Sequence, residues 1–291
     1  MKFKRLIHAI TALIQITRPF QWPKNLFLYA PAFFGGLIHD ALIMKQMTLG
    51  FAAFCMISGA GYVINDLHDC YDDQNHPVKC NRPIASGRIS SYLAMNWTIA
   101  LVTISIITAS CLGSCFMLWT IAYLVLVILY TYKIKPLSYL NTVTVTVGFL
   151  IRLCAGGAIA DIPISGWLFV SVFILSLFLG HLKRFWDEYQ RNPSSVNQLN
   201  IEQHQIHDIA FSSQILLIMN LAIYIGYILF TFKSLPFAFT IFPVAVGLYR
   251  AVFLVYKKAK PVPFEWMLLG DWLLIFCFLV WLGSWYVLLY P

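Results

Sequence analysis

An acidic run at residues 65–73 holds the residues best suited to chemistry in this sequence. It contains one asparagine and four aspartates, although only 11% of the 291 residues are charged. On an α-helix, with about 100° between successive residues, these side chains would share about one third of the circumference. Carboxylates on one helix face repel one another, and a bound cation would offset that cost. The polar residues are Asn65, Asp66, Asp69, Asp72 and Asp73.

Oxygen ligands of this kind favour a hard ion such as Mg²⁺, which typically takes one or two carboxylates and shares substrate phosphates. The run therefore predicts a magnesium site. Its three spaced aspartates, Asp66, Asp69 and Asp73, are also the candidate catalytic residues. A solvated acidic loop is the alternative. The predicted metal ligands are Asn65, Asp66, Asp69 and Asp73.

Basic residues follow the acidic run within one loop, residues 66–90. Lys79 and Arg82 are near enough in the chain to fold over whatever the metal holds. A metal on carboxylates at one side and Lys or Arg at the other is a common way to bind a diphosphate. An ordinary basic loop would explain these two side chains but not the carboxylates before them. Both are therefore candidate substrate-binding residues.

A second polar cluster follows the apolar segment 164–182, at the start of a second long loop, residues 183–207. Lys183 and Asp187 are four residues apart and would share a helix face, so a structural salt bridge is an open alternative. Both long loops follow even-numbered apolar segments and start from the same side of the membrane. We therefore expect Lys183, Arg184 and Asp187 to complete a shared substrate site.

Four further polar residues are candidates for substrate binding. Lys24 and Asn25 lie where the first apolar segment begins, and a lysine that reaches for the membrane surface would be the simpler interpretation there. Lys133 lies at the inner end of another segment, where anionic lipid headgroups would also account for it. Arg152 lies inside an apolar segment, and because a charge is costly there it usually faces a polar cavity or a partner.

The elements that must position these residues are membrane-spanning helices. With 60% hydrophobic residues and a mean hydropathy of +0.75, the chain lies far outside the range of water-soluble domains. About 20 residues suffice to cross a bilayer, and we expect about nine such helices in one integral-membrane domain, 1–291. Residues 1–20 fit a helix lying in the membrane interface. The expected spans are 22–42, 46–65, 91–112, 114–131, 138–160, 164–182, 208–232, 235–256 and 266–289.

The net charge of +8 is distributed unevenly around these spans. With the N-terminus cytoplasmic and the C-terminus outside, nearly all lysines and arginines of the loops fall on the inner side, as the positive-inside rule requires. This orientation places both long loops on the cytoplasmic face of the inner membrane. Topology thus explains the basic excess, and we expect a lipid bilayer and no nucleic acid as partner.

The run Asn65-Asp66-x-x-Asp69-x-x-x-Asp73 resembles the first aspartate-rich motif of the UbiA superfamily of intramembrane prenyltransferases. Three further stretches resemble one of its branches, the decaprenyl-phosphate 5-phosphoribosyltransferases. Asp187 stands where that branch usually has a glutamate, and Asn141 where an aspartate is common. The three stretches are Arg18-Pro19-x-Gln21-Trp22-x-Lys24-Asn25, His76-Pro77-x-Lys79-x-x-Arg82-Pro83-Ile84-Ala85-Ser86-Gly87, and Lys183-Arg184.

The resemblance implies a UbiA-like bundle of nine helices and a Mg²⁺-dependent reaction. In that reaction, 5-phosphoribose would pass from phosphoribosyl pyrophosphate to a polyprenyl phosphate, and pyrophosphate would be released. Lys79 and Arg82 would add positive charge beside the metal-bound diphosphate. Lys24, with Lys183 or Arg184, would hold the remaining donor phosphate. The oligomeric state is left open.

Three other functions are weighed against this one. A UbiA-type enzyme could use the same motif to move a prenyl group from a prenyl diphosphate to an aromatic acceptor. The CDP-alcohol phosphotransferases also carry repeated aspartates on a membrane helix, but in an order that this chain lacks. A transporter would distribute its charges across the bilayer midplane, whereas here they collect on one side.

Overall fold

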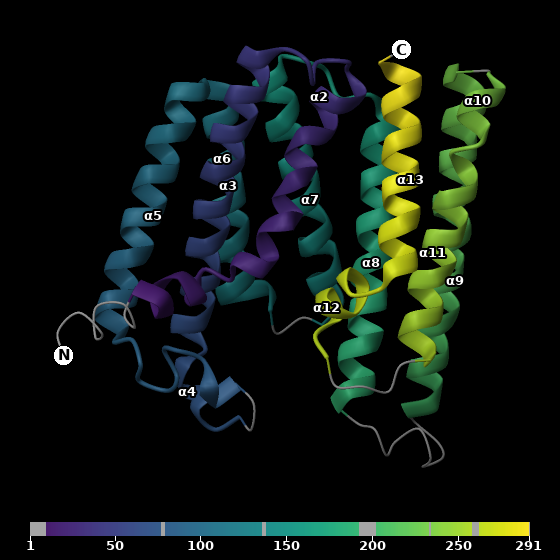
Figure 1. The fold of residues 1–291 in the computed structure, drawn as a ribbon. Helices are drawn as coiled ribbons and strands as arrows, with labels where there is room; N and C mark the ends of the chain where they lie inside the picture. The colour runs from purple at the N-terminus through teal and green to yellow at the C-terminus, as the bar shows by residue number, and fades with distance from the viewer. Residues whose placement is uncertain are drawn as a thin grey trace. The chain divides into compact units, whose positions relative to one another are not determined.

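The computed structural model describes residues 10–76, 79–135, 138–191, 202–232, 234–257 and 262–290, and among them it contains helices and no strands. By internal packing the chain divides into two compact units, Met1–Ile164 (unit 1) and Ser165–Pro291 (unit 2). Each unit is described by itself, and Figure 1 shows the helices of both. The single domain over residues 1–291 stays a prediction, since this division concerns packing alone.

Unit 1 is a bundle of long helices around a central one. Its elements are η1 (Pro19–Tyr29), α2 (Ala30–Phe34), α3 (Ala41–His68), α4 (Cys70–Gln74), η2 (Lys79–Asn81), α5 (Ser91–Leu112), α6 (Ser114–Leu129), its continuation η3 (Tyr130–Ile134) and α7 (Ser138–Ala160). The central helix α3 packs against η1, α5, α6 and α7. Large apolar side chains of α3, α6 and α7, among them Phe54, Phe116 and Ile151, form its core.

Unit 2 contains the remaining helices. They are α8 (Gly166–Arg191), α9 (Glu202–Tyr227), its continuation η5 (Ile228–Phe232), α10 (Leu235–Ala238), α11 (Ile241–Lys257), α12 (Phe264–Leu269) and α13 (Trp272–Leu289). Its core joins α8, α11 and α12 through buried side chains that include Phe178, Trp186, Leu254 and Phe264. The short helix α12 is thereby held against the end of α8 that carries the second polar cluster.

Eight helices in the described part of the chain are long and apolar enough to cross a membrane. They cover eight of the nine predicted spans, and α5 and α7 begin and end where the predicted spans 91–112 and 138–160 do. The expected all-α membrane fold is thus confirmed. The predicted orientation of the two termini stays a prediction.

The predicted span 22–42 differs from the others because it is not one continuous α-helix. The eleven residues of η1 form a 3₁₀-helix, α2 follows, and α3 begins at Ala41. Pro19, Pro23 and Pro31 lack the N–H that an α-helix interior needs. A 3₁₀-helix is tighter than an α-helix and rises about 2 Å per residue, so η1 extends over about 20 Å beside α3 and α7 (Figure 1).

A glycine on α7 makes this close packing possible. A Cβ atom built on Gly156 would lie 2.0 Å from the carbonyl oxygen of Leu28, so no side chain fits between η1 and α7 there. Asn25 and Leu28, one turn of η1 apart, are completely buried as a result. Polar Asn25 is thereby carried into the interior of unit 1.

The segment predicted as an interface helix and the predicted loop 183–207 are largely helical where they are described, and the predicted loop 66–90 contains the short helices α4 and η2. Residues 10–16 form a helix whose Ala12 and Ile16 pack on Val63 and Ile84, while residues 1–9 of the predicted interface helix lie outside the described residues. Helix α8 extends to Arg191 and α9 begins at Glu202, so residues 192–201 of the predicted loop 183–207 also lie outside them.

Candidate active site

The three spaced aspartates meet at one end of α3. Asp66 lies near the end of α3, Asp69 is the residue between α3 and α4, and Asp73 belongs to α4. Backbone hydrogen bonds from Asp69 N to Asn65 O (3.0 Å) and from Asp73 N to Asp69 O (2.8 Å) keep a helical path across the junction. Asp66, Asp69 and Asp73 are only 3%, 6% and 3% exposed, whereas Asp72 points to solvent. We call these three buried residues the carboxylate cluster.

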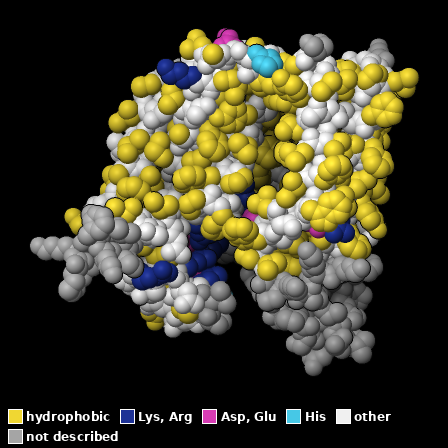
Figure 2. Space-filling view, viewed as in Figure 1, with side chains coloured by type: hydrophobic (Ala, Val, Ile, Leu, Met, Phe, Trp, Pro, Cys, Tyr) yellow, Lys and Arg dark blue, Asp and Glu magenta, His cyan; other side chains and the backbone are white. Residues whose placement is uncertain are grey.

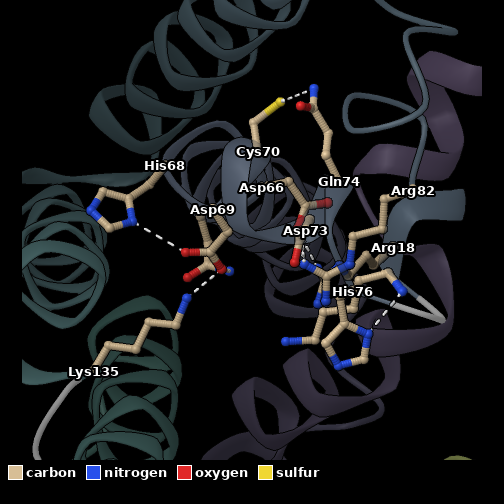
Figure 3. Close-up of polar contacts among 12 residues, drawn as sticks. Arg18, Asp66, His68, Asp69, Cys70, Asp73, Gln74, His76, Arg82 and Lys135 are labelled. Atoms are coloured by element: carbon tan, nitrogen blue, oxygen red, sulfur yellow. Dashed lines mark hydrogen bonds and ion pairs between the residues drawn. The ribbon is translucent and has the colours of Figure 1, made fainter.

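Two arginines bind one side of the carboxylate cluster (Figure 3). Arg18 donates from Nη2 to Asp66 Oδ1 at 2.5 Å. Arg82 donates from Nη1 to the same oxygen at 3.1 Å and to Asp73 Oδ2 at 2.6 Å. One guanidinium nitrogen therefore bridges two carboxylates that are seven residues apart in the sequence.

Asp69 points away from these arginines, toward another set of partners (Figure 3). Its Oδ2 accepts hydrogen bonds from Asn65 Nδ2 (3.1 Å) and from the ammonium group of Lys135, and His68 Nδ1 lies 3.1 Å from Oδ1. Burial raises the pKa of Asp69, but the hydrogen bonds from Lys135 and His68 outweigh it, so the pKa lies below its usual value. The Asp69 carboxylate is therefore ionised near neutral pH.

Arg18, which contacts Asp66, lies at a turn between two helices. Its backbone is left-handed (φ 51°, ψ 66°), a conformation that is costly for a residue with a side chain. This turn separates the helix of residues 10–16 from η1, and the guanidinium lies 5.1 Å from the centre of the Tyr62 ring. Arg18 is the first residue of the motif Arg18-Pro19-x-Gln21-Trp22-x-Lys24-Asn25, but it was not among the predicted substrate-binding residues.

A change of helix type selects the lysine that meets Asp69. At Tyr130 the helix α6 becomes the π-helix η3, which has more residues per turn and so changes which side chains face the cluster. Lys133 is exposed, whereas Lys135, directly after η3, contacts Asp69. The role predicted for Lys133 stays a prediction, and Lys135 is the lysine that the fold brings to the cluster.

The loop after α4 is held by its own contacts. Arg88 donates from Nη2 to the carbonyl oxygen of Asn81 at 2.5 Å, and the backbone N–H of Lys79 lies 3.3 Å from His76 Nδ1. Within the described residues the ammonium of Lys79 pairs with none of the three carboxylates, so of this loop's two candidates Arg82 alone touches the cluster. Figure 2 shows basic side chains gathered at this end of unit 1, while hydrophobic ones cover its visible side.

Asn25 and Arg152, predicted as substrate-binding residues, are in contact with each other. Arg152 donates from Nε to Asn25 Oδ1 at 2.7 Å, and both side chains are buried. They lie between η1 and α7, deeper in unit 1 than the carboxylate cluster. Lys24, the neighbour of Asn25, is half-buried on η1.

The second polar cluster lies in unit 2, on the last turns of α8. Lys183 donates to Glu265 Oε1 of α12 at 2.7 Å, and Trp186 Nε1 donates to the carbonyl oxygen of Val262 at 2.9 Å. Arg184 is half-buried and Asp187 is exposed. Glu265 was missed in the sequence, where nothing marks it as a partner of α8. A substrate role of Lys183, Arg184 and Asp187 stays a prediction.

The oxygen ligands of the carboxylate cluster fit Mg²⁺ as a metal shared with a substrate. Among the described residues, no three His, Cys, Asp or Glu side chains are close enough to hold one ion by themselves. Mg²⁺ commonly needs only one or two carboxylates, with phosphates and waters as its other ligands. Asp66 and Asp73 form one such pair. Asn65 Oδ1, buried and without a hydrogen-bond partner, offers a second position beside Asp69.

A model of the UbiA prenyltransferase family matches residues 27–283. Among curated proteins, the chain is similar to a decaprenyl-phosphate phosphoribosyltransferase of Mycolicibacterium smegmatis, with 32% identity over 182 residues (61% of this chain, 57% of that protein). A protein of the same name from Mycobacterium tuberculosis is 31% identical over 182 residues (61% of this chain, 60% of that protein). The chain thus spans less than two thirds of the length of these curated relatives.

The fold is also found among solved structures. A UbiA homolog from Archaeoglobus fulgidus, bound to GPP and Mg²⁺, superposes with a TM-score of 0.71 over 96% of this chain and 100% of that one. The two sequences are 15% identical, so this likeness concerns the fold.

Proposed function

The chain belongs to the UbiA prenyltransferase family, and we propose that it transfers 5-phosphoribose from phosphoribosyl pyrophosphate to a polyprenyl phosphate. The observation that carries the proposal is the match between three buried carboxylates and three basic side chains from separate segments, Arg18, Arg82 and Lys135. Carboxylates hold divalent metals, whereas Arg and Lys hold phosphate oxygens. A site with both in direct contact suits a metal-bound diphosphate.

The choice of donor is supported by the curated relatives. Two proteins similar to this chain carry the name decaprenyl-phosphate phosphoribosyltransferase. That name specifies a phosphoribosyl group as the group transferred and a lipid phosphate as its acceptor. Because the diphosphate is common to phosphoribosyl and prenyl donors, the carboxylate cluster by itself fits either.

The residues that would hold Mg²⁺ are Asp66 with Asp73, and Asn65 with Asp69. When bound, the metal would act as a Lewis acid that withdraws negative charge from the diphosphate. Arg82 and Lys135 would bind the remaining diphosphate oxygens. Because these basic groups are already placed at the cluster, little reorganisation is needed as charge grows on the leaving group.

The reaction would be a substitution at the anomeric carbon of the ribose. An oxygen of the acceptor phosphate forms the new bond to C1 while the bond from C1 to the diphosphate oxygen breaks, and its electron pair leaves with pyrophosphate. The acceptor phosphate is already anionic, so no side chain has to remove a proton from it. The apolar helices around the site would exclude water, which would otherwise compete for C1.

The remaining predicted contacts belong to this proposal. Lys24 and Lys79 would bind donor phosphates from η1 and from the loop after α4, and Lys133 would add to the local positive charge. Substrate binding is likewise the role proposed for Lys183, Arg184 and Asp187. Basic side chains gather at the carboxylate end of unit 1 (Figure 2). We therefore place that end on the cytoplasmic side of the inner membrane.

The proposal is tested with the purified full-length protein in lipid nanodiscs containing a polyprenyl phosphate. With Mg²⁺ and phosphoribosyl pyrophosphate, we expect pyrophosphate and a phosphoribosylated lipid to form together. Asp73→Asn should lower kcat by about 100-fold or more, as loss of a charge-stabilising group typically does. Asp72→Asn, which changes the exposed neighbouring carboxylate, is the matched control. Absence of both products from the unaltered protein would refute the proposal.

A second candidate is transfer of a prenyl group from a prenyl diphosphate to an aromatic acceptor. The Archaeoglobus fulgidus UbiA homolog, whose structure contains GPP and Mg²⁺, favours this candidate because GPP is a prenyl diphosphate. The same nanodiscs with a prenyl diphosphate and an aromatic acceptor distinguish the two. Pyrophosphate release under those conditions alone would establish this second function in place of the first.

A further inference from the structure

Arg152 is a buried cation within α7 whose described partners are all neutral. Its guanidinium donates to Asn25 Oδ1 (2.7 Å), to the carbonyl oxygen of Gly148 (2.8 Å) and to Tyr123 Oη (2.9 Å). The rings of Tyr123 and Phe149 lie 4.6 and 5.7 Å from it. The side chain is 5% exposed, and among the described residues it forms no ion pair with a carboxylate.

A second arginine within a span, Arg250, provides an internal comparison. Arg250 of α11 donates from Nε and Nη2 to both oxygens of Asp271, at 3.2 and 2.9 Å. Its charge is therefore balanced within unit 2. Arg152 is the more deeply buried of the two arginines, yet its charge is not balanced in this way. A charge in the membrane interior is costly without a partner and usually marks a functional position.

The position of Arg152 relates it to the carboxylate cluster. Its partner Asn25 also donates to Ser58 Oγ of α3 at 3.3 Å. Ser58 and Asn65 are seven residues apart on α3, so they share a face and are separated by about 10 Å along the helix. Asn65 in turn donates to Asp69. One face of α3 thus connects the predicted metal ligands with Arg152, two turns deeper.

We propose that Arg152 is the counter-ion of a phosphate monoester that a substrate places between these helices. The inference rests on the proposed function, in which the acceptor lipid and the donor each carry such a group. Of the five N–H groups of a guanidinium, three are used by the described partners. The other two suit the oxygens of one phosphate.

The proposed function gives this separation a chemical meaning. The acceptor oxygen must approach C1 from the side opposite to the leaving diphosphate, so the two phosphate sites must lie on either side of the ribose. A cation about two turns deeper than the metal ligands provides that second site. Phosphate binding would also supply the negative charge that the described partners of Arg152 lack.

The first test measures binding without turnover. The full-length protein in nanodiscs is titrated with dodecyl phosphate, with ribose 5-phosphate and with uncharged dodecanol. Arg152→Gln should weaken binding of one of the two phosphates at least tenfold and leave dodecanol unchanged. The phosphate that is affected tells whether the lipid acceptor or the donor supplies the group. Arg152→Lys keeps the charge but loses the planar guanidinium. Its affinity for that phosphate should lie between those of the unaltered protein and Arg152→Gln.

A second variant separates a binding role from a structural one. Asn25→Asp is nearly isosteric and gives Arg152 a carboxylate of its own at the position of Asn25 Oδ1. It should raise the unfolding temperature and weaken phosphate binding, because the counter-ion is then internal. Stabilisation without loss of phosphate affinity, or unchanged affinity in Arg152→Gln, would overturn the inference. Failure of the proposed function would appear separately, as a lack of pyrophosphate release by the unaltered protein.

Discussion

Replacing Lys135 by Gln tests whether the π-helix at the end of α6 selects the lysine that serves the active site. The change removes one positive charge from Asp69 while keeping a polar side chain of similar length. Lys133→Gln removes the same charge two residues earlier, from an exposed side chain. Both variants lose the same charge, so a difference between their activities reports the position of the lysine.

The expected magnitude follows from the burial of the pair. The Asp69 side chain is 8% exposed and that of Lys135 is 34% exposed. Two unit charges about 4 Å apart interact by about 4 kcal/mol at an effective dielectric constant of 20. Solvent around a lysine that is one-third exposed reduces this to about 1–2 kcal/mol. A charge interaction of that size with the diphosphate corresponds to a loss of roughly 5- to 30-fold.

The assay is pyrophosphate release as a function of donor concentration, with binding of Mn²⁺ measured separately by electron paramagnetic resonance. For Lys135→Gln we expect kcat/KM for the donor to fall about tenfold. Binding of Mn²⁺ without donor should tighten, because Asp69 no longer has an ammonium as a competing partner. A loss in Lys133→Gln that equals or exceeds that in Lys135→Gln would refute the argument from the π-helix.

Three further predictions concern the fold and the charges that support the site. Gly156→Ala places a methyl group against the backbone of Leu28 and should cost about 1–3 kcal/mol or more of stability. Gly283→Ala is the control, because a Cβ atom there would have nothing within 4 Å; its stability should stay the same or rise by up to about 1 kcal/mol. Equal unfolding temperatures for the two variants would contradict the packing argument. Lys183→Met removes the ion pair with Glu265 and should speed amide hydrogen exchange in α12 but not in α5; unchanged exchange in α12 would argue against that contact. Because the pKa of Asp69 is lowered on folding, its ion pair stabilises the protein above the unfolded value of about 3.9 and is lost as pH falls through the folded value. Asp69→Asn should therefore flatten the acid limb of unfolding temperature against pH, and an unaltered limb would show that Lys135 does not stabilise Asp69.

The sequence predicted the spans well because a lipid-facing helix needs a long apolar stretch whatever its neighbours are. Helices α5 and α7 begin and end where the apolar segments do. Most of the carboxylate cluster could also be predicted, since Asp66, Asp69 and Asp73 recur at helical spacing. The same spacing includes Asp72, however, and only the structure shows that this residue is exposed. Such features depend on local periodicity, which the chain carries without tertiary contacts.

The partners of these carboxylates were decided by the tertiary structure. Arg18 lies 48 residues from Asp66 and Lys135 lies 66 residues from Asp69, so no local pattern joins them. Arg18 depends on a left-handed backbone, and Lys135 on a π-helix, neither of which composition predicts. The same holds for η1, where a 3₁₀-helix with Pro19 and Pro23 packs closely against Gly156 in place of the expected α-helix.

The sequence by itself thus determined which residues are acidic, which segments enter the membrane and which face of a helix the aspartates share. Tertiary packing alone decided that three cations would meet those aspartates and that Arg152 would be buried against Asn25. The physical reason is one of range. Periodicity acts over a few residues, whereas an ion pair between distant segments exists only after the helices have packed and excluded the water that would otherwise solvate each charge.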